Sequence, residues 1–224
     1  MSSEEEAAAP VDPGSLSRVI PIFPLSGVLL LPRGLLPLNI FEPRYLAMTR
    51  DALSGHRLIG MIQPVESGRG RQPDVYSIGC VGEIASAADT SDGRILITLR
   101  GLCRFAVEAE LDVDTMYRQV TADYSRFAAD AVPAPAGQFS RDRLLNALRA
   151  YCTRHNLPAD WDSINAAGDE LLVHSLCMIC PFTPGEKQAL LEAADFPARA
   201  EMLITLLEMA LLDNVGPQQG RNLH

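Results

Sequence analysis

The stretch VIPIFPLSGVLLLPRGLLPLNIFEPRY, residues 19–45, contains short apolar runs that are repeatedly interrupted by proline. Proline has no backbone N–H to give to a sheet, so within sheets it is confined to strand ends and edges. The segment around Ile20 and Ile22, the run Val28–Leu31 and the run Leu35–Phe41 are therefore predicted to be short strands. Short, bent strands of this kind are typical of a small barrel.

The residues that follow continue the same pattern up to about residue 124. Pro43 stands at a first helical position, and Gly55 supplies a stop, which predicts one short helix between them. Apolar and alternating segments predict strands at Leu58–Ile62, from Tyr76 onward, in ILITLRG, in CRFAVEAEL and at Tyr117–Tyr124, with a hairpin turn at Asp92-Gly93. About seven short strands and one helix close most simply as a β-barrel or pseudobarrel.

A change of pattern near residue 125 predicts a second domain. Residues 126–138 are rich in alanine and proline and are predicted to be a linker, and residues 139–212 read as a bundle of four helices. The third helix opens with the capping box Thr183-Pro184-Gly185-Glu186. Residues 1–17 and 213–224 are predicted to be flexible tails. The fold class is therefore α+β: a pseudobarrel with one short helix over residues 18–125, then a helical bundle.

Composition excludes several classes of function. The formal net charge is -9 and the pI is about 4.9, which opposes general affinity for nucleic acid or anionic lipid. Lys187 is the sole lysine and is followed by glutamine, so no phosphate-binding P-loop is present. The acidic N-terminal segment and the lack of long apolar runs predict a soluble, cytoplasmic protein. Five cysteines in apolar segments are predicted to be reduced and packed.

Three segments carry a family resemblance. IPIFPLSGVLLLPRGLLPLNIFEPRYLAM resembles the opening of the N-terminal substrate-binding domain of Lon proteases, and GCVGEIASAADTSDGRILITLRGLCRF and GEKQALLEAADFPARAEML resemble later parts of that domain in the same order. The resemblance implies a PUA-like pseudobarrel followed by helices. The residues that carry it are expected to be mainly structural: Phe41, Glu42, Pro43, Arg44, Tyr45, Gly101, Arg104, Phe105, Glu186, Lys187 and Gln188.

The resemblance also implies a function. Neither the ATPase P-loop nor the serine-lysine protease dyad is found, so we expect a non-enzymatic, stand-alone module without a cofactor that binds unfolded or degron-bearing polypeptide. It could serve as an adaptor or regulator of proteolysis or of protein quality control. Two alternatives stay open: an RNA-binding PUA-like module that uses Arg57, Arg69 and Arg71, and a structural subunit of a separate Lon protease. Monomer and weak dimer are both compatible with the sequence.

The candidate polypeptide-binding residues come from the opening stretch, which holds more leucine than an alternating strand with one wet face needs. Exposed leucines beside a strand edge would suit an extended polypeptide, whereas burial of the same leucines would make them core. The candidates are Leu29, Leu30, Leu31, Pro32, Leu35 and Leu36. Glu42 and Arg44 are predicted to brace the start of the helix, and Phe41 and Tyr45 to belong to the core.

His174, Cys177 and Cys180 form a string that could attract a metal ion, with Cys152 as a conceivable fourth ligand. Helical spacing points His174 nearly opposite to the face of Leu172 and Leu176, so the three side chains are not expected to converge. Buried thiols in an apolar helix are the preferred interpretation, and no metal site is predicted.

Overall fold

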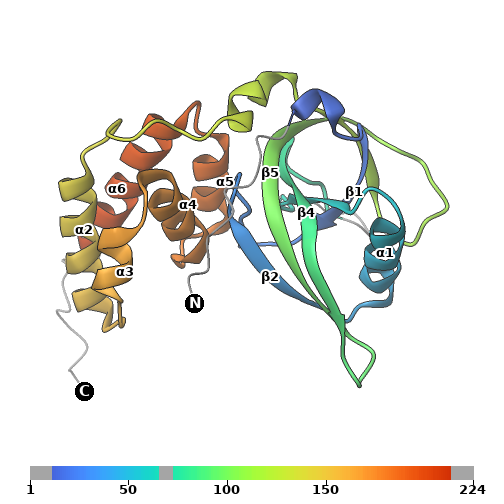
Figure 1. The fold of residues 1–224 in the computed structure, drawn as a ribbon, viewed down its shortest axis with the longest axis horizontal. Coiled ribbons are helices and arrows are strands. Elements are labelled where there is room, and N and C mark those ends of the chain that lie inside the picture. The colour runs from blue at the N-terminus through green and yellow to red at the C-terminus, as the bar shows by residue number, and fades with distance from the viewer. Residues whose placement is uncertain (1–11, 66–72, 213–224) are drawn as a thin grey trace, which may run out of the picture. The chain divides into compact units, whose positions relative to one another are not determined.

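The computed structural model describes residues 12–65 and 73–212, and its internal contacts divide the chain into two compact units (Figure 1). Unit 1 contains residues 12–134 together with 177–192, and unit 2 contains residues 135–176 together with 193–212. Most of the predicted tails, and the loop arginines Arg69 and Arg71, lie outside the described residues. Within the predicted N-terminal tail, Pro13–Ser15 forms a short 3-10 helix, η1, whose Gly14 amide donates to the Asp12 side chain.

Unit 1 is built around a mixed six-stranded sheet in the order β2-β5-β4-β3-β1-β6. Strands β5 and β6 also pair with each other, and this pairing closes the sheet into a ring, the expected pseudobarrel. Strands β1 and β3 run parallel, and the other pairs are antiparallel. The strands are β1 Val19–Pro24, β2 Leu35–Ile40, β3 Leu58–Ile62, β4 Ile78–Asp89, β5 Ile95–Glu110 and β6 Gln119–Asp123.

Two strand predictions were wrong. Val28–Leu31 is not a strand but a buried segment without regular structure. The two segments predicted on either side of Gly101 form one long strand, β5, which bends instead of ending. The register against β4 shifts between Val81 and Gly82, opposite Gly101, which is how the strand turns around the barrel without a break.

Close backbone approach explains two glycines of the barrel. A Cβ on Gly79 would lie 2.6 Å from the Met61 carbonyl oxygen and 2.6 Å from the Phe105 ring, and Phe105 is fully buried. A Cβ on Gly101 would meet the Leu31 backbone. Its absence lets the Gly101 amide donate to Gly34 O at 2.9 Å, while its carbonyl accepts from Arg33 N at 2.7 Å. The buried segment before β2 is therefore fixed to β5 by backbone hydrogen bonds.

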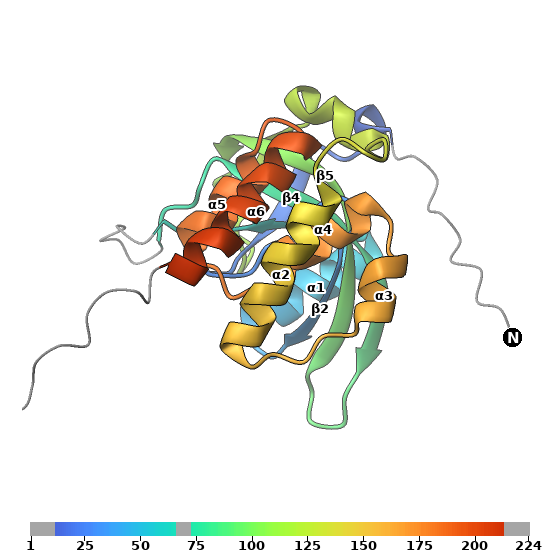
Figure 2. The same cartoon turned by 90° about the vertical axis from the view of Figure 1, so that its left-hand side faces the viewer.

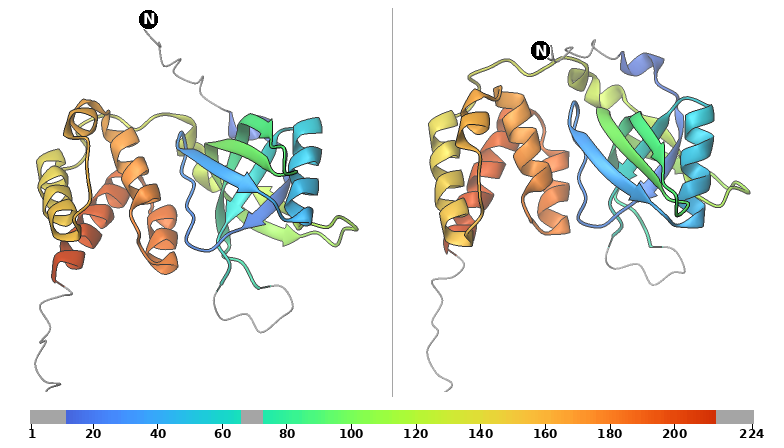
Figure 3. Two further views of the ribbon diagram at one scale, coloured as in Figure 1. Left: turned by 90° about the horizontal axis from the view of Figure 1, so that it is seen from below. Right: turned by 60° about the horizontal axis from the view of Figure 1, so that its bottom comes forward.

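Helix α1, Pro43–Ser54, lies beside the barrel, with Pro43 at its start and Gly55 at its C-cap as predicted (Figure 3). Its buried face carries Tyr45 and Met48, and the ring of Tyr45 lies 4.1 Å from that of Phe23 on β1. Phe41 was expected in the core, but it is 62% exposed. It precedes the helix at a turn, outside the stripe of positions that faces the barrel.

Helix α5, Pro184–Glu192, groups with the barrel and not with the other helices, which differs from the domain boundaries expected from the sequence. Its capping box is confirmed: Thr183 N donates to Glu186 Oε2 at 2.7 Å, and Glu186 N donates to Thr183 Oγ1 at 3.3 Å. The segment expected to be a linker begins inside η2, Ser125–Ala131, a 3-10 helix with buried Phe127 and Asp130.

Unit 2 is helical. It contains α2 Arg141–His155, α3 Trp161–Ala166, most of α4 Asp169–Ile179, and α6 Phe196–Leu212. Helices α2 and α6 lie side by side (Figure 2), where Arg143 reaches Glu201 and Glu208. The short α3 was not predicted, and Asp160 caps it by accepting from Ser163 N at 3.1 Å. No helix in the described part of the chain is long and apolar enough to cross a membrane.

Candidate functional site

A groove of about 330 Å³ opens on unit 1 between β1, the first turn of α1 and the connection from β5 to β6. Its walls are formed by segments that are far apart in the sequence, including Ile22, Pro64 and Met116. Ligand pockets in proteins begin at about 300 Å³. This groove reaches that size, and its lining combines apolar side chains with a larger share of polar and charged ones.

The floor of the groove is fixed by the packing of α1 against β1. Ile22 is fully buried, and Tyr45 is 6% exposed. The Arg44 guanidinium lies 4.4 Å from the centre of the Tyr45 ring, a cation–π distance. Burial raises the pKa of Tyr45 above its ordinary value, so its hydroxyl stays protonated near neutral pH.

The opposite wall is the connection 111–118, which carries two apolar side chains to the surface. Val113 is 40% exposed and Met116 is 66% exposed. Both ends of this connection are held: Leu111 N donates to Gln119 O at 2.9 Å, and the Tyr117 hydroxyl donates to Asp51 Oδ2 on α1 at 2.8 Å. Burial and the Asp51 carboxylate raise the pKa of Tyr117 to about 12. The apolar side chains are thus presented from an anchored loop.

The two arginines that line the groove are each paired with a glutamate. Arg118 makes a fork onto Glu110, with Nε–Oε1 and Nη2–Oε2 distances of 2.6 Å, and its Nη1 donates to Pro73 O at 2.9 Å. The fork lowers the pKa of Glu110 and raises that of Arg118. Arg44 binds Glu42 through Nε at 3.0 Å and Nη2 at 2.8 Å.

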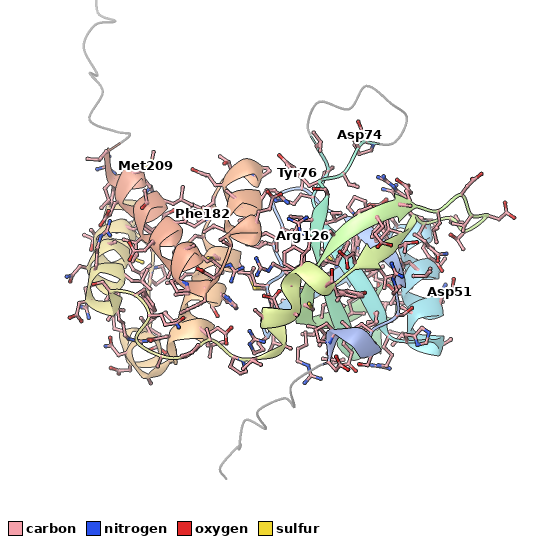
Figure 4. The ribbon with its side chains drawn as sticks, turned by 90° about the horizontal axis from the view of Figure 1, so that it is seen from above. Asp51, Asp74, Tyr76, Arg126, Phe182 and Met209 are labelled. Atoms are coloured by element: carbon pink, nitrogen blue, oxygen red, sulfur yellow. The ribbon has the colours of Figure 1, made fainter. Side chains whose placement is uncertain are left out.

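Three further aspartates lie near the groove. Asp112 lines it, Asp114 lies on the same connection, and Asp74 follows Pro73 on another wall. Asp112 and Asp114 form no ion pair with another residue in the described ranges, whereas the charge of Asp74 acts on Arg118 and helps to raise its pKa. Figure 4 labels Asp51 on α1 and Asp74 beside Tyr76.

The residues that the sequence offered as a polypeptide-binding site do not form one surface. Leu29, Leu30 and Leu31 are at most 2% exposed, and Pro32 is buried as well. Leu36 is half-buried, and only Leu35 is strongly exposed, at 61%. The packing of this stretch against β4 and β5 explains the burial, since Leu30 lies against Gly82 and Gly101.

Leu35 lies on an edge strand. Among the described strands, β2 pairs only with β5, with Leu35 opposite Arg100 and Pro37 opposite Thr98. Pro37 offers no N–H at the middle of this edge, which weakens it as a template for another strand. A shallow hollow of about 460 Å³ lies here, lined among others by Pro37 and Leu96.

Several motif residues serve to fasten α5 to the barrel. Gln188 Nε2 donates to Ile78 O at 3.1 Å, and Gln63 Nε2 donates to Pro184 O at 2.9 Å. Arg104 on β5 reaches Leu191 O at 3.1 Å. Lys187 Nζ donates to Met178 O at 3.0 Å, and burial lowers its pKa.

The brace expected at the start of α1 takes a different form. Glu42 is the N-cap residue, but its side chain makes no capping hydrogen bond. The Glu42 carboxylate forms an ion pair with Arg44 instead. Arg44 was expected to pair with a nearby carboxylate, and that carboxylate is Glu42. Both side chains are about half exposed, at 44% and 49%.

The residues His174, Cys177 and Cys180, considered above as metal ligands, lie in separate environments. His174 Nε2 lies 3.1 Å from Arg199 Nη1, and Cys177 and Cys180 are buried near Lys187. Among the described residues, no group of three or more potential ligands is placed to hold a metal ion. Arg57, weighed for RNA binding, donates through Nη2 to Ile84 O at 2.6 Å inside the fold.

The groove could not be predicted directly from the sequence. Its wall residues Val113 and Met116 lie between two predicted strands, in a segment for which no helix or strand was predicted. The one available signal was the alternation of apolar and polar residues in LDVDTMYR, in which Leu111, Val113 and Met116 stand among polar neighbours.

Comparison with known proteins identifies the family. Residues 19–209 match the family described as the ATP-dependent protease La (LON) substrate-binding domain. The chain belongs to this family. Lon protease 2 of Sorangium cellulosum is 28% identical over 211 residues, and that of Myxococcus xanthus is 26% identical over 199 residues. These alignments cover 84% and 86% of this chain but only 24% of each Lon protease.

Solved Lon N-terminal domains have the same fold. A Lon N-terminal domain protein from Xanthomonas campestris superposes with a TM-score of 0.57 at 23% identity, covering 84% of this chain and 97% of that one. The N-terminal domain of the Mycobacterium avium complex Lon protease gives a TM-score of 0.58 at 15% identity, covering 88% and 100%. The Lon N-terminal architecture, a pseudobarrel followed by helices, is therefore the architecture of this chain.

Proposed function

We propose that the chain binds unfolded or degron-bearing polypeptide through the groove beside α1. Membership in the Lon substrate-binding domain family supports polypeptide as the ligand class. The observation that carries the location is the anchored connection 111–118, which holds Val113 and Met116 at the surface of the groove. An adaptor or regulatory role in proteolysis would follow from such binding.

The chemistry of the groove suits polypeptide without demanding one sequence. Methionine is flexible and polarisable, so it adapts to different partner side chains. Prolines at positions 24, 64 and 73 give apolar walls that have no N–H to satisfy. A volume of about 330 Å³ suits one or two side chains of an extended segment more than a folded partner.

The test is binding of a fluorescent, permanently unfolded polypeptide, followed by fluorescence anisotropy. Met116→Asp places a charge on the exposed lip and is expected to weaken binding roughly tenfold, the change that corresponds to about 1.4 kcal/mol. Leu35→Asp is the matched control, because Leu35 is similarly exposed, at 61% against 66%, but lies on β2 and not on the groove. It should leave affinity unchanged.

The two variants separate two locations for the site. If Leu35→Asp weakens binding and Met116→Asp does not, the polypeptide adds to the edge of β2, as the opening leucines first indicated. If the wild-type chain binds no unfolded polypeptide at all, the proposed function is wrong. Circular dichroism before each titration establishes that both variants are folded.

A further inference from the structure

We infer that the groove selects apolar segments flanked by lysine or arginine and discriminates against segments flanked by aspartate or glutamate. This inference rests on the proposed function and names the class of polypeptide that the same site takes. It comes from the juxtaposition, on the connection 111–118, of exposed apolar side chains and aspartates that form no ion pair with any described residue, with Val113 between Asp112 and Asp114.

The charge of the groove is decided by its aspartates. Both arginines that line it are neutralised by neighbouring glutamates, Arg118 by Glu110 and Arg44 by Glu42. Asp112 and Asp114 have no ion pair among the residues that the structure describes, and Asp74 adds a third negative charge that acts on Arg118. The local field is therefore negative, in line with the net charge of -9 for the whole chain.

The arginines are poorly placed to attract an acidic ligand. Arg118 uses Nε and Nη2 on Glu110 and Nη1 on Pro73 O, so its fork is occupied on every nitrogen. Arg44 uses Nε and Nη2 on Glu42 while its guanidinium lies against the Tyr45 ring. A carboxylate of the ligand would have to displace these glutamates. An ammonium or guanidinium group meets the carboxylates of Asp112 and Asp114, which form no ion pair within the described ranges.

The length of an extended chain per residue determines at which positions of the ligand the basic residues should stand. An extended segment advances about 3.3 Å per residue. A side chain that enters the groove between Tyr45 and Met116 therefore has neighbours one to three residues away within reach of the aspartates on the rim. The preferred ligand is an apolar residue with a basic residue on either side at that distance.

The experiment compares three fluorescent peptides that share one apolar core and differ only in their flanks, which are lysine, serine or glutamate. Exposed ion pairs contribute modestly, so the lysine peptide is expected to bind about threefold to tenfold tighter than the serine peptide. The glutamate peptide should bind more weakly than both. Raising the salt concentration should reduce the differences, because exposed charges are screened.

Variants of the aspartates then test whether these residues cause the preference for lysine flanks. The double variant Asp112→Asn, Asp114→Asn should lose most of the preference for lysine flanks and still bind the serine peptide. Asp89→Asn is the matched control, since Asp89 is an exposed aspartate at the end of β4 that does not line the groove. It should keep the full preference.

The outcomes distinguish the two proposals. If none of the three peptides binds, the proposed function fails. If all bind with equal affinity, if the glutamate peptide binds best, or if the double variant keeps the preference for lysine, the groove still takes polypeptide but the inferred charge selectivity is wrong.

Discussion

Arg104 and Asp130 form a two-pronged ion pair inside unit 1, with Nε–Oδ2 and Nη2–Oδ1 distances of 2.9 Å. The side chains are 4% and 8% exposed. The Asp130 carboxylate also accepts from the Arg104 amide at 3.0 Å, and Arg104 Nη1 donates to Leu191 O. One side chain on β5 thus holds η2 and α5, segments that lie far from it in the sequence.

Removing one partner of this pair should strongly destabilise unit 1. Asp130→Asn leaves a guanidinium buried without its counter-charge, which typically costs about 3–5 kcal/mol. Urea unfolding, followed by circular dichroism, measures the change. Glu108→Gln is the control, because it removes a carboxylate from an exposed pair with Arg18, which contributes little. Equal effects of the two substitutions would show that the buried pair has no special role.

Replacing both residues of the ion pair by apolar ones tests whether the loss in Asp130→Asn comes from the uncompensated charge. The double variant Arg104→Met, Asp130→Leu removes both charges, so no uncompensated charge remains and part of the stability should return relative to Asp130→Asn. The interaction free energy follows when the single variants Arg104→Met and Asp130→Leu are titrated with urea in the same way. A double variant less stable than the single one would contradict the assignment.

The glycine at position 79 should not tolerate a methyl group. Gly79→Ala would place Cβ 2.6 Å from both Met61 O and the Phe105 ring, so backbone or core must shift and the thermal midpoint should fall by several degrees. Gly185→Ala on α5 meets nothing within 4 Å and should be neutral or stabilising by about 0.4–1 kcal/mol. Calorimetry measures the thermal midpoints of both variants, and an equal midpoint for Gly79→Ala and Gly185→Ala would contradict the prediction.

The opening leucines should divide into two classes. Leu30 is 1% exposed, so Leu30→Ala is expected to cost about 2–5 kcal/mol of unfolding free energy through the cavity it leaves. Leu35 is 61% exposed, and Leu35→Ala should change stability little. A similar loss for both in urea titrations would mean that β2 is covered in solution.

Tyr117 should make stability fall at alkaline pH. Its pKa is raised to about 12 from an ordinary value of 10, so the stabilisation it gives is complete below pH 10 and is lost as the pH rises through about 12. Unfolding free energies measured between pH 9 and 12 should therefore fall more steeply for the wild type than for Tyr117→Phe. Asp51→Asn removes one cause of the shift and should lower the pH at which the Tyr117 phenolate absorbs. Identical pH profiles would contradict the assigned contact.

Features set by local chemistry could be predicted from the sequence. Pro43 at the start of α1, Gly55 at its end, the limits of β3 and the capping box of α5 all depend on residues within one turn or one strand. The order of barrel strands and later helices followed from the change in apolar period.

Features that depend on contacts between residues far apart in the sequence could not be predicted from it. The run Val28–Leu31 has the composition of a strand, but backbone hydrogen bonds from Gly101 to the adjoining Arg33 and Gly34 hold the stretch as an irregular buried segment. The groove brings together residues as separated as Ile22 and Met116, and no spacing in the sequence marks such a pair. Phe41 was misplaced because apolar character alone does not fix which side of a turn is buried.

Each of the two units is built from two separate stretches of sequence, and this determines the order in which their contacts can form during synthesis on the ribosome. The barrel unit needs α5, and α5 is synthesised only after residues 135–176, which belong to the helical unit. Until residue 192 has left the exit tunnel, Arg104 lacks Leu191 O and the Gln188 contacts are missing. The last contacts of the barrel unit therefore form after most of the other unit has been synthesised. A chain that ends before α5 would lack these contacts, even with every strand of the ring already translated.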